Sequence, residues 1–434
     1  MSTISYINKA MRPIDGTPLH DLELPDDYVP RDQVEITPGQ EPTTPDKKKW
    51  TVLVYMQGNN NLGPLVAESL NDLAFVGSDN NLNIVSQLSY TNGHSYDPAK
   101  ISAKRYYVEK NKAVELANLG YVDMGAPKAV SDFLEWGIKK FPAEHYLVIM
   151  EDHGDQWLGG WRDEASHHML TMPQIAGAIA EATERTGVKP DIVAFDSCLM
   201  AGTEVAKQLE GKADIMIGSE EVEFGSWWSG EMAAPLRPIL GALKAGSQNE
   251  AMTPRDFGVK WVEECSKSWT TPTQSAVDLT KIGPVTQGAD DLAALLLSPD
   301  IPAETVRLAV AASQHYETYS GKKPFVHLHD AYDFADVLTN QMGQADPELA
   351  EKASALKQAI QEAVIAEEHQ AGSLDKSHGL SIYLPTEPES VERPFEQFQH
   401  AVGVHLDMED RYDDLDMASQ TRWDEMFKRI TYGK

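Results

Sequence analysis

Apolar and polar positions follow two alternating periods between about residue 50 and residue 230. Short apolar runs of strand length are separated by segments in which apolar residues recur every three or four positions, which is the spacing of a helix. The strand-like runs are 50–56, 82–90, 105–110, 145–150, 191–196 and 213–219, and the helix-like segments are 62–76, 126–141, 172–187 and 199–211. This alternation predicts a mostly parallel sheet with helices on both faces.

The pattern changes on either side of this region. Residues 1–47 are rich in proline and charge and predict an extended arm, which the composition leaves open as a linker, a pro-segment or a strap. After residue 230 the helical period dominates. The helix-like segments there are 253–269, 304–319 and 347–369, and the strand-like runs are 275–279 and 379–385. We therefore divide the chain into an arm (1–47), an α/β core (48–230) and a mostly helical region (231–434) that returns strands to the core.

Two strand-like runs end in residues that can carry chemistry. The run 145–150 is followed by His153 and Gly154, and the run 191–196 is followed by Cys198. Ligands of parallel sheets bind beyond the carboxyl ends of the strands. The pattern therefore predicts that His153 and Cys198 meet at one edge of the sheet.

A cysteine and a histidine at such an edge are the parts of a nucleophilic site. A cysteine attacks as the thiolate, and a histidine can take its proton and later return it to a leaving amine. The backbone N–H groups of Gly154 and Cys198 are the expected donors to the oxyanion of the tetrahedral intermediate. A helix starting near Leu199 would favour the thiolate at its N-terminus.

Composition excludes several other classes of function. The formal charge is −30, from 37 basic and 67 acidic residues, which argues against nucleic acid or an anionic membrane surface as a partner. Cys198 and Cys265 are the only cysteines, too few for a disulfide framework, although one disulfide between them stays open. No apolar stretch reaches the roughly 18 residues of a membrane span, and no signal peptide is visible. We expect a location in the bacterial cytoplasm, or secretion if a signal has been removed.

At this point several segments, in order, resemble the clostripain-like cysteine peptidases, a family with the caspase and gingipain type of α/β fold. The segments are WTVLVYMQGNNNL, YLVIMEDHGDQW, FDSCLMAGTEVA, GSEEVE, SAVDL and HGLSIYLP, and the resemblance runs from about Trp50 to about Trp423. It implies a caspase-like three-layer α/β/α sandwich with a helical C-terminal addition. It also implies an endopeptidase that acts on peptide or protein substrates.

The resemblance assigns roles to individual residues. His153 matches the catalytic histidine, Cys198 the nucleophile, and Gly154 with the Cys198 backbone the oxyanion donors. Asp196 matches the aspartate behind the family's preference for cleavage after Arg or Lys. In an extended segment residues i and i+2 point the same way, which would place Asp196 beside Cys198.

Further residues of the substrate site follow from the same resemblance. We expect Glu221, Ser226 and Trp227 to contact the substrate. The run FGSWW (224–228) departs from the family pattern, because Ser226 stands about where a second acidic group is usual. Two tryptophans there would instead suit a more apolar pocket.

Activation and cofactors are also suggested by the resemblance. Several relatives are activated by self-cleavage, for which Arg162 is the candidate here, the alternative being an ordinary loop arginine. Some relatives need calcium, but the acidic runs WRDEASHH and DMEDRYDDLD lack the spacing of a calcium loop. We therefore expect no required cofactor, with calcium as the alternative. HLHDAYD (327–333) lacks the spacing of known zinc motifs, and we assign no metal site.

Three functions fit these observations. The leading hypothesis is a cysteine endopeptidase with a Cys-His dyad and a thioester intermediate. The second is a binding or scaffold protein on a peptidase fold whose activity has faded, motivated by the altered FGSWW run. The third is a protease gated by its N-terminal arm or by a regulatory protein partner.

Overall fold

A computed structural model describes most of the chain. The described residues are 34–41, 46–91, 96–225, 232–248, 252–316, 327–343, 346–388, 391 and 412–433. Two expected substrate residues, Ser226 and Trp227, lie outside them, as do residues 1–33 of the predicted arm.

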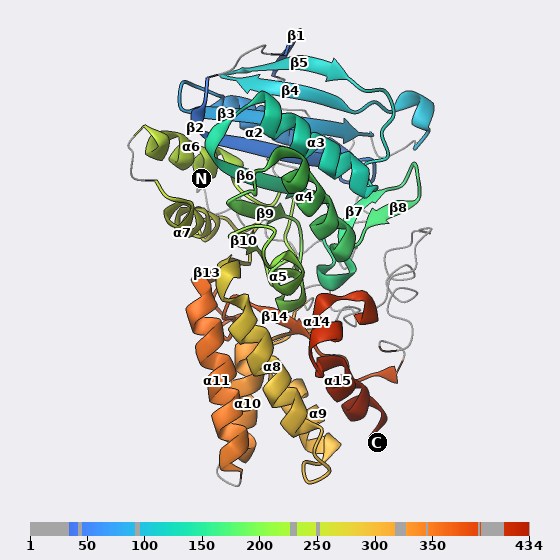
Figure 1. Cartoon of the computed structure of the whole chain (residues 1–434), viewed down its shortest axis with the longest axis vertical. Helices are drawn as coiled ribbons and strands as arrows, with labels where there is room; N and C mark the ends of the chain where they lie inside the picture. The colour runs from blue at the N-terminus through green and yellow to red at the C-terminus, as the bar shows by residue number, and fades with distance from the viewer. Residues whose placement is uncertain are drawn as a thin grey trace, which may run out of the picture.

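A ten-stranded sheet forms the centre of the described structure (Figure 1). In spatial order its strands are β1 (Glu35–Pro38), β5 (Lys112–Asn118), β4 (Lys104–Glu109), β3 (Leu82–Tyr90), β2 (Lys48–Gly58), β6 (Ala143–Glu151), β9 (Ile192–Asp196), β10 (Ile215–Gly218), β11 (Thr273–Asp278) and β13 (Val364–His369). The five neighbours from β3 to β10 run parallel, and β4, β11 and β13 pair antiparallel. The carboxyl ends of the five central strands therefore lie along one edge.

Helices cover both faces of this sheet. Alternation along β2 explains why, since Val52 and Val54 belong to one buried apolar cluster and Leu53 and Tyr55 to the other. The helices whose apolar residues lie in the first cluster are α2 (Gly63–Val76), α6 (Leu236–Ser247) and α7 (Pro254–Cys265). Those in the second are α3 (Pro127–Lys140), α4 (Met172–Thr186) and α5 (Thr203–Leu209). The predicted three-layer α/β/α fold is confirmed.

The C-terminal region adds a group of helices beyond one end of the sheet, drawn in yellow to red in Figure 1. They are α8 (Ile282–Leu296), α9 (Ala303–Ala312), α10 (Ala331–Met342), α11 (Pro347–Ala363), α14 (Asp416–Gln420) and α15 (Trp423–Tyr432). Two short strands, β12 (Leu328–Asp330) and β14 (Ser381–Tyr383), pair with each other. The region thus returns β11 and β13 to the main sheet, whereas the run expected at 379–385 lies in the separate β12–β14 pair.

Three expectations from the apolar pattern were wrong. The helix expected over 304–319 stops early, because α9 ends at Ala312 and Ser313 is extended. The segment 347–369 is not one helix, because α11 ends at Ala363 and the β-branched Val364 and Ile365 begin β13, which pairs with β11. The helix expected from residue 199 begins only at Thr203. A small hairpin, β7 (Gly160–Asp163) and β8 (His168–Leu170), follows the His-Gly segment and was not predicted.

Part of the predicted arm packs against the sheet. Residues Glu35–Pro38 pair with β5, and the Trp136 indole Nε1 donates to a Glu41 carboxylate oxygen at 2.7 Å. Of the three alternatives for the arm, residues 34–41 therefore behave as a strap along the outer strand. The proposed boundaries near residues 47 and 230 remain predictions.

Candidate active site

Three neighbouring strands bring the candidate residues to one edge of the sheet. β2, β6 and β9 are adjacent and parallel, and Glu151 of β6 pairs in register with Asp196 of β9. His153 and Cys198 each stand two residues beyond this pair. The topology therefore brings together the two segments that the sequence singled out.

The two segments touch at Gly154. A Cβ atom at this position would lie 2.5 Å from the Cys198 carbonyl oxygen and 2.9 Å from the Met200 side chain. Only a residue without a side chain fits such an approach. The glycine after His153 is thus required by packing, whatever its backbone N–H does in the reaction.

Three consecutive asparagines at the end of β2 hold the His153 segment. Asn59 Nδ2 donates to an Asp163 carboxylate oxygen at 2.8 Å, and Asn60 Nδ2 donates to Asp152 at 2.6 Å. Asn61 Oδ1 lies 2.8 Å from His153 Nε2. The sequence marked these asparagines only as a turn, because contacts with residues about 90 to 100 positions away leave no trace in a local pattern.

Cys198 lies near several carboxyl groups. Its sulfur accepts a hydrogen bond from the Glu223 backbone N–H at 3.3 Å. Burial is the largest cause that raises the pKa of the Cys198 thiol well above its ordinary value, and the charges of Glu223, Asp155 and Glu221 raise it further. The neutral thiol of Cys198 is therefore favoured over the thiolate in the protein alone.

The helix dipole does not supply this activation. Helix α5 begins five positions after Cys198, and a dipole acts within the first turn. Leu199 has a positive φ of 66°, which is uncommon for a residue with a branched side chain, and its N–H donates to the Glu221 carbonyl oxygen at 3.3 Å. Cys198 thus sits on a tight turn held by the 219–223 segment, and the expected helix start near Leu199 was wrong.

Asp196 is buried at the end of β9 on the side of the sheet that α6 covers. One carboxylate oxygen accepts the Ala234 backbone N–H at 2.8 Å. Cys198, in contrast, packs against the apolar cluster of the other face. The two side chains therefore do not share one face as the i, i+2 spacing suggested, because the strand ends at Asp196 and its alternation ends with it.

A cluster of three buried carboxyls surrounds this position. Burial raises the pKa of Asp196 to about 7, and burial followed by the Asp196 charge raises the pKa values of Glu151 and Glu223 well above the ordinary range. In the part of the chain that the structure describes, no Lys or Arg forms an ion pair with any of the three. Burial therefore disfavours the ionised forms of all three carboxyls in the protein alone.

Glu223 links this carboxyl cluster to Cys198, and the sequence did not single it out. Its backbone contacts Cys198, while its carboxylate accepts Gln274 Nε2 at 2.6 Å. The signal was present, since Glu223 is the last acidic residue of the GSEEVE block. The predicted Glu221 is also buried near Cys198, where one carboxylate oxygen accepts the Val222 N–H.

Glu204 was likewise missed as an organising residue. One oxygen of its buried carboxylate accepts Tyr383 N–H and Tyr412 O–H, both at 2.9 Å. The other oxygen accepts Gln156 Nε2 at 2.5 Å. Glu204 thus links Gln156, in the segment after His153, to Tyr383 and Tyr412 of the C-terminal region by hydrogen bonds.

Arg162 is not an exposed loop residue. It is 2% exposed within β7, and its carbonyl oxygen accepts the side-chain N–H groups of Gln57 and Asn60 at 2.6 and 2.9 Å. Self-cleavage after Arg162 remains a prediction, and it would require this buried segment to become accessible. The open alternative of a disulfide is also excluded, since Cys198 and Cys265 are both free thiols.

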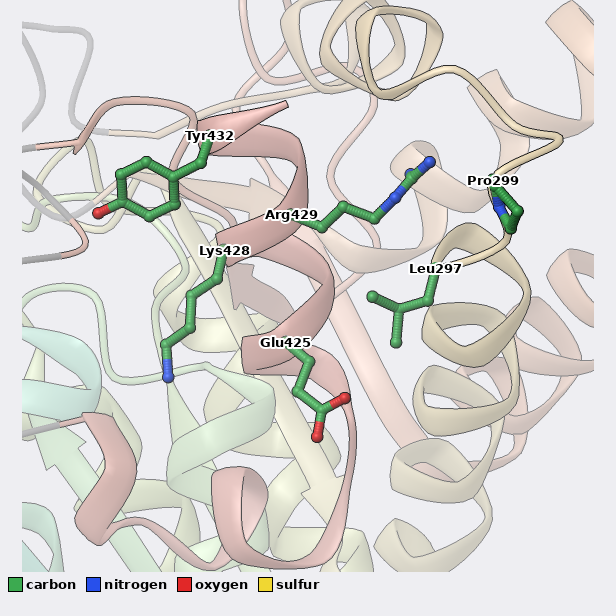
Figure 2. A pocket seen from close by; sticks show the side chains of 6 residues that line it. All are labelled: Leu297, Pro299, Glu425, Lys428, Arg429 and Tyr432. Atoms are coloured by element: carbon green, nitrogen blue, oxygen red, sulfur yellow. The ribbon is translucent and has the colours of Figure 1, made fainter. Parts of the chain in front are cut away.

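The described residues do not gather metal ligands into a site. They contain no group of three or more His, Cys, Asp or Glu side chains placed to hold a metal ion. A surface pocket between α15 and the end of α8 is lined by Leu297, Pro299, Glu425, Lys428, Arg429 and Tyr432 (Figure 2). Its Arg429 guanidinium already donates to the carbonyls of Leu296, Ser298 and Ile301, so we assign the pocket no ligand.

Comparisons with known proteins agree on one family. A family model described as the clostripain family matches residues 54–429. Clostripain from Hathewaya histolytica is 22% identical over 409 residues, which cover 78% of this chain and 75% of that protein.

Solved structures show the same fold. A secreted C11 cysteine protease from Bacteroides thetaiotaomicron, in complex with an irreversible peptide inhibitor, has a TM-score of 0.59 at 18% identity, covering 82% of this chain and 97% of its own. An inactive zymogen C11 protease from Parabacteroides distasonis has a TM-score of 0.61 at 18% identity, covering 87% and 99%. The expected cytoplasmic location gains no support, because the first of these proteins is described as secreted. Within the described residues, no helix has the length and apolar character needed to span a membrane.

Proposed function

Because the chain belongs to the clostripain family of cysteine peptidases, we propose that it is an endopeptidase that cleaves after Arg or Lys, with Cys198 as nucleophile and His153 as general base. The observation that carries this proposal is the in-register pair Glu151 and Asp196, beyond which the two residues stand on adjacent strands. Acyl transfer needs a nucleophile and a base that lie close to each other, and the ends of neighbouring strands can provide this arrangement.

The reaction begins with a neutral Cys198 thiol and a neutral His153 imidazole. His153 takes the proton of the Cys198 thiol as the sulfur attacks the carbonyl carbon of the scissile bond. The N–H groups of Gly154 and Cys198 stabilise the oxyanion of the tetrahedral intermediate. The intermediate collapses to a thioester as the C–N bond breaks, and the imidazolium gives its proton to the leaving amine. Water, deprotonated by His153, then hydrolyses the thioester.

The buried carboxyl cluster supports a preference for a basic side chain before the cleaved bond. An arriving guanidinium or ammonium group favours the ionised forms of Asp196 and Glu223, which burial and mutual repulsion disfavour in the free protein. The substrate would thus supply the cation that the pocket lacks. Glu223 would provide the second acidic group that is usual in the family about where Ser226 stands in this sequence.

Regulation by self-cleavage stays part of the proposal. Arg162 is buried, so cleavage after it would first require the segment that carries it to become accessible. Calcium dependence and a regulatory protein partner remain predictions. Activity measured in calcium and in EDTA separates a cation requirement from a chemistry that uses thiol and imidazole alone.

Peptide amides with fluorescent leaving groups test the proposal directly. We expect cleavage after Arg and Lys, little after Leu or Asp, and loss of activity in Cys198→Ala. Cys265→Ala is the matched control, because Cys265 is buried in α7 and its carbonyl accepts the Thr271 hydroxyl rather than taking part in the site. An active Cys198→Ala variant would refute the mechanism. A well-folded wild type without any activity or thiol-probe labelling would favour the binding-protein alternative.

A further inference from the structure

The order of strands places His153 between two other groups. Asn61 follows β2, His153 follows β6 and Cys198 follows β9, and these strands are neighbours in that order. The imidazole therefore has the asparagine on one side and the cysteine segment on the other. Such a line of three groups can fix which ring nitrogen serves as the base.

The contact between Asn61 and His153 selects the tautomer. Asn61 Oδ1 lies 2.8 Å from His153 Nε2, and an amide oxygen only accepts hydrogen bonds. Nε2 therefore carries the hydrogen in the neutral ring, and Nδ1 keeps the lone pair. We propose that Asn61 is a positioning residue that holds His153 in this tautomer, with Nδ1 as the base toward Cys198. This inference rests on the proposed function.

Side-chain hydrogen bonds of Asn60 fix the turn that carries Asn61. Asn60 Oδ1 accepts the Leu62 N–H at 2.8 Å across Asn61, and Asn60 Nδ2 donates to Asp152 and to the Arg162 carbonyl. The amide of Asn61 is thus presented from a fixed backbone. A group that orients a base needs such support, because a freely turning side chain would hold the ring in several positions.

A neutral partner suits the electrostatics of this site. The charges of Glu223, Asp155 and Glu221 already raise the pKa of the Cys198 thiol. A carboxylate at position 61 would add another negative charge and favour the protonated imidazole, which cannot act as a base. An amide oxygen orients the ring without this cost. Asn61 therefore differs in kind from a charged third member of a triad.

The test is the pH profile of kcat and kcat/KM in Asn61 variants, measured on a peptide amide with Arg before the cleaved bond. Asn61→Ala is expected to lower kcat about 10- to 100-fold, part of what a positioned general base supplies, with little change in KM. Asn61→Asp keeps the acceptor and the shape, and it is expected to move the acid limb of kcat/KM to higher pH by about one unit. Asn81→Ala, at the opposite edge of the sheet beside the N-terminus of β3, should leave both unchanged.

Two results would overturn the inference. One is an Asn61→Ala variant with the kcat and pH profile of Asn81→Ala, and the other is an Asn61→Asp variant whose acid limb does not move. If Asn61→Ala does not fold, as judged by its melting temperature, the near-isosteric Asn61→Asp profile decides alone. Failure of the proposed function is separate, because it would appear as an active Cys198→Ala variant.

Discussion

The two sides of the candidate site differ in the partners of their buried polar groups. On the His153 side, the buried polar groups meet neutral amides, as Asn60 meets Asp152 and Asn61 meets His153. On the Cys198 side, Asp196 and Glu223 crowd together without a cationic partner among the described residues. An amide partner fixes the position of a buried polar side chain, whereas buried carboxyls without a cationic partner can attract a cation. This difference underlies our proposal that one side orients the base and the other side receives the substrate.

The largest effect is expected where the two sides touch. Gly154→Ala would bring a Cβ within 2.5 Å of the Cys198 carbonyl oxygen, which is backbone and cannot turn away. Displacing this contact is expected to reduce kcat/KM by at least about 100-fold, the loss typical of a disturbed oxyanion hole. The measurement is steady-state cleavage of an Arg peptide amide together with the melting temperature.

Gly177→Ala is the matched control for this change. A Cβ at Gly177, within α4, meets no atom within 4 Å. Alanine also favours a helix over glycine, so this variant should keep full activity and gain about 0.5–1 kcal/mol of stability. Equal activity in the two variants would show that the two segments do not need their close approach.

A smaller, selective effect is expected from removing charge on the Cys198 side. Asp196→Asn keeps the shape and the acceptor for the Ala234 N–H but cannot pair with a cation. We expect kcat/KM for Arg and Lys substrates to fall about 10- to 100-fold, the value of one charge-assisted hydrogen bond, and Leu substrates to change little. The ratio of Arg to Leu cleavage is the quantity to follow.

A second variant makes the same change, from carboxylate to amide, on the His153 side of the site. Asp163→Asn alters a buried carboxylate that accepts Asn59 Nδ2 and the Met124 N–H. This variant is expected to lose stability but to keep the Arg-to-Leu ratio. If Asp163→Asn and Asp196→Asn change the ratio equally, the proposed division between orientation and recognition is wrong.

The smallest expected effect is on the pH dependence of stability. The pKa of Asp196 is raised from its ordinary value of 3.8 to about 7, so the folded protein binds more protons than the unfolded chain between these pH values. The contribution of Asp196 to the free energy of unfolding therefore falls as the pH rises through this window. Asp196→Asn removes the penalty, and its melting temperature should gain on the wild type as the pH rises from about 4 to about 7. A constant difference in melting temperature would contradict the raised pKa.

The sequence predicted the parts of the fold that depend on local period. The strand 82–90 was placed at its observed bounds, and Gly187 caps α4 in the left-handed conformation as expected. The break between α11 and β13 was missed, because the residues near 364 also fit a continuing helix and only pairing with β11 decides. A local pattern of apolar residues does not contain the pairing with a distant strand that decides between helix and strand at these positions.

The candidate site shows the same limit. His153 and Cys198 were found because strand ends and family likeness both point to them. Glu223, Glu204 and Asn61 were missed as site residues, since each matters through a contact with a distant segment. An i, i+2 rule also misplaced Asp196 relative to Cys198, because the strand ended between them.

The most direct test of the central claim is covalent labelling of the wild-type protein with a peptide electrophile that ends in Arg, compared with one that ends in Leu. Intact mass and peptide mapping would locate the adduct, with the labelling rate measured beside His153→Ala and Asp196→Asn. We predict a single adduct on Cys198, formed faster with Arg than with Leu, slowed in both variants and absent from Cys265. Labelling at another residue, or equal rates for the two electrophiles in the wild type, would contradict the account.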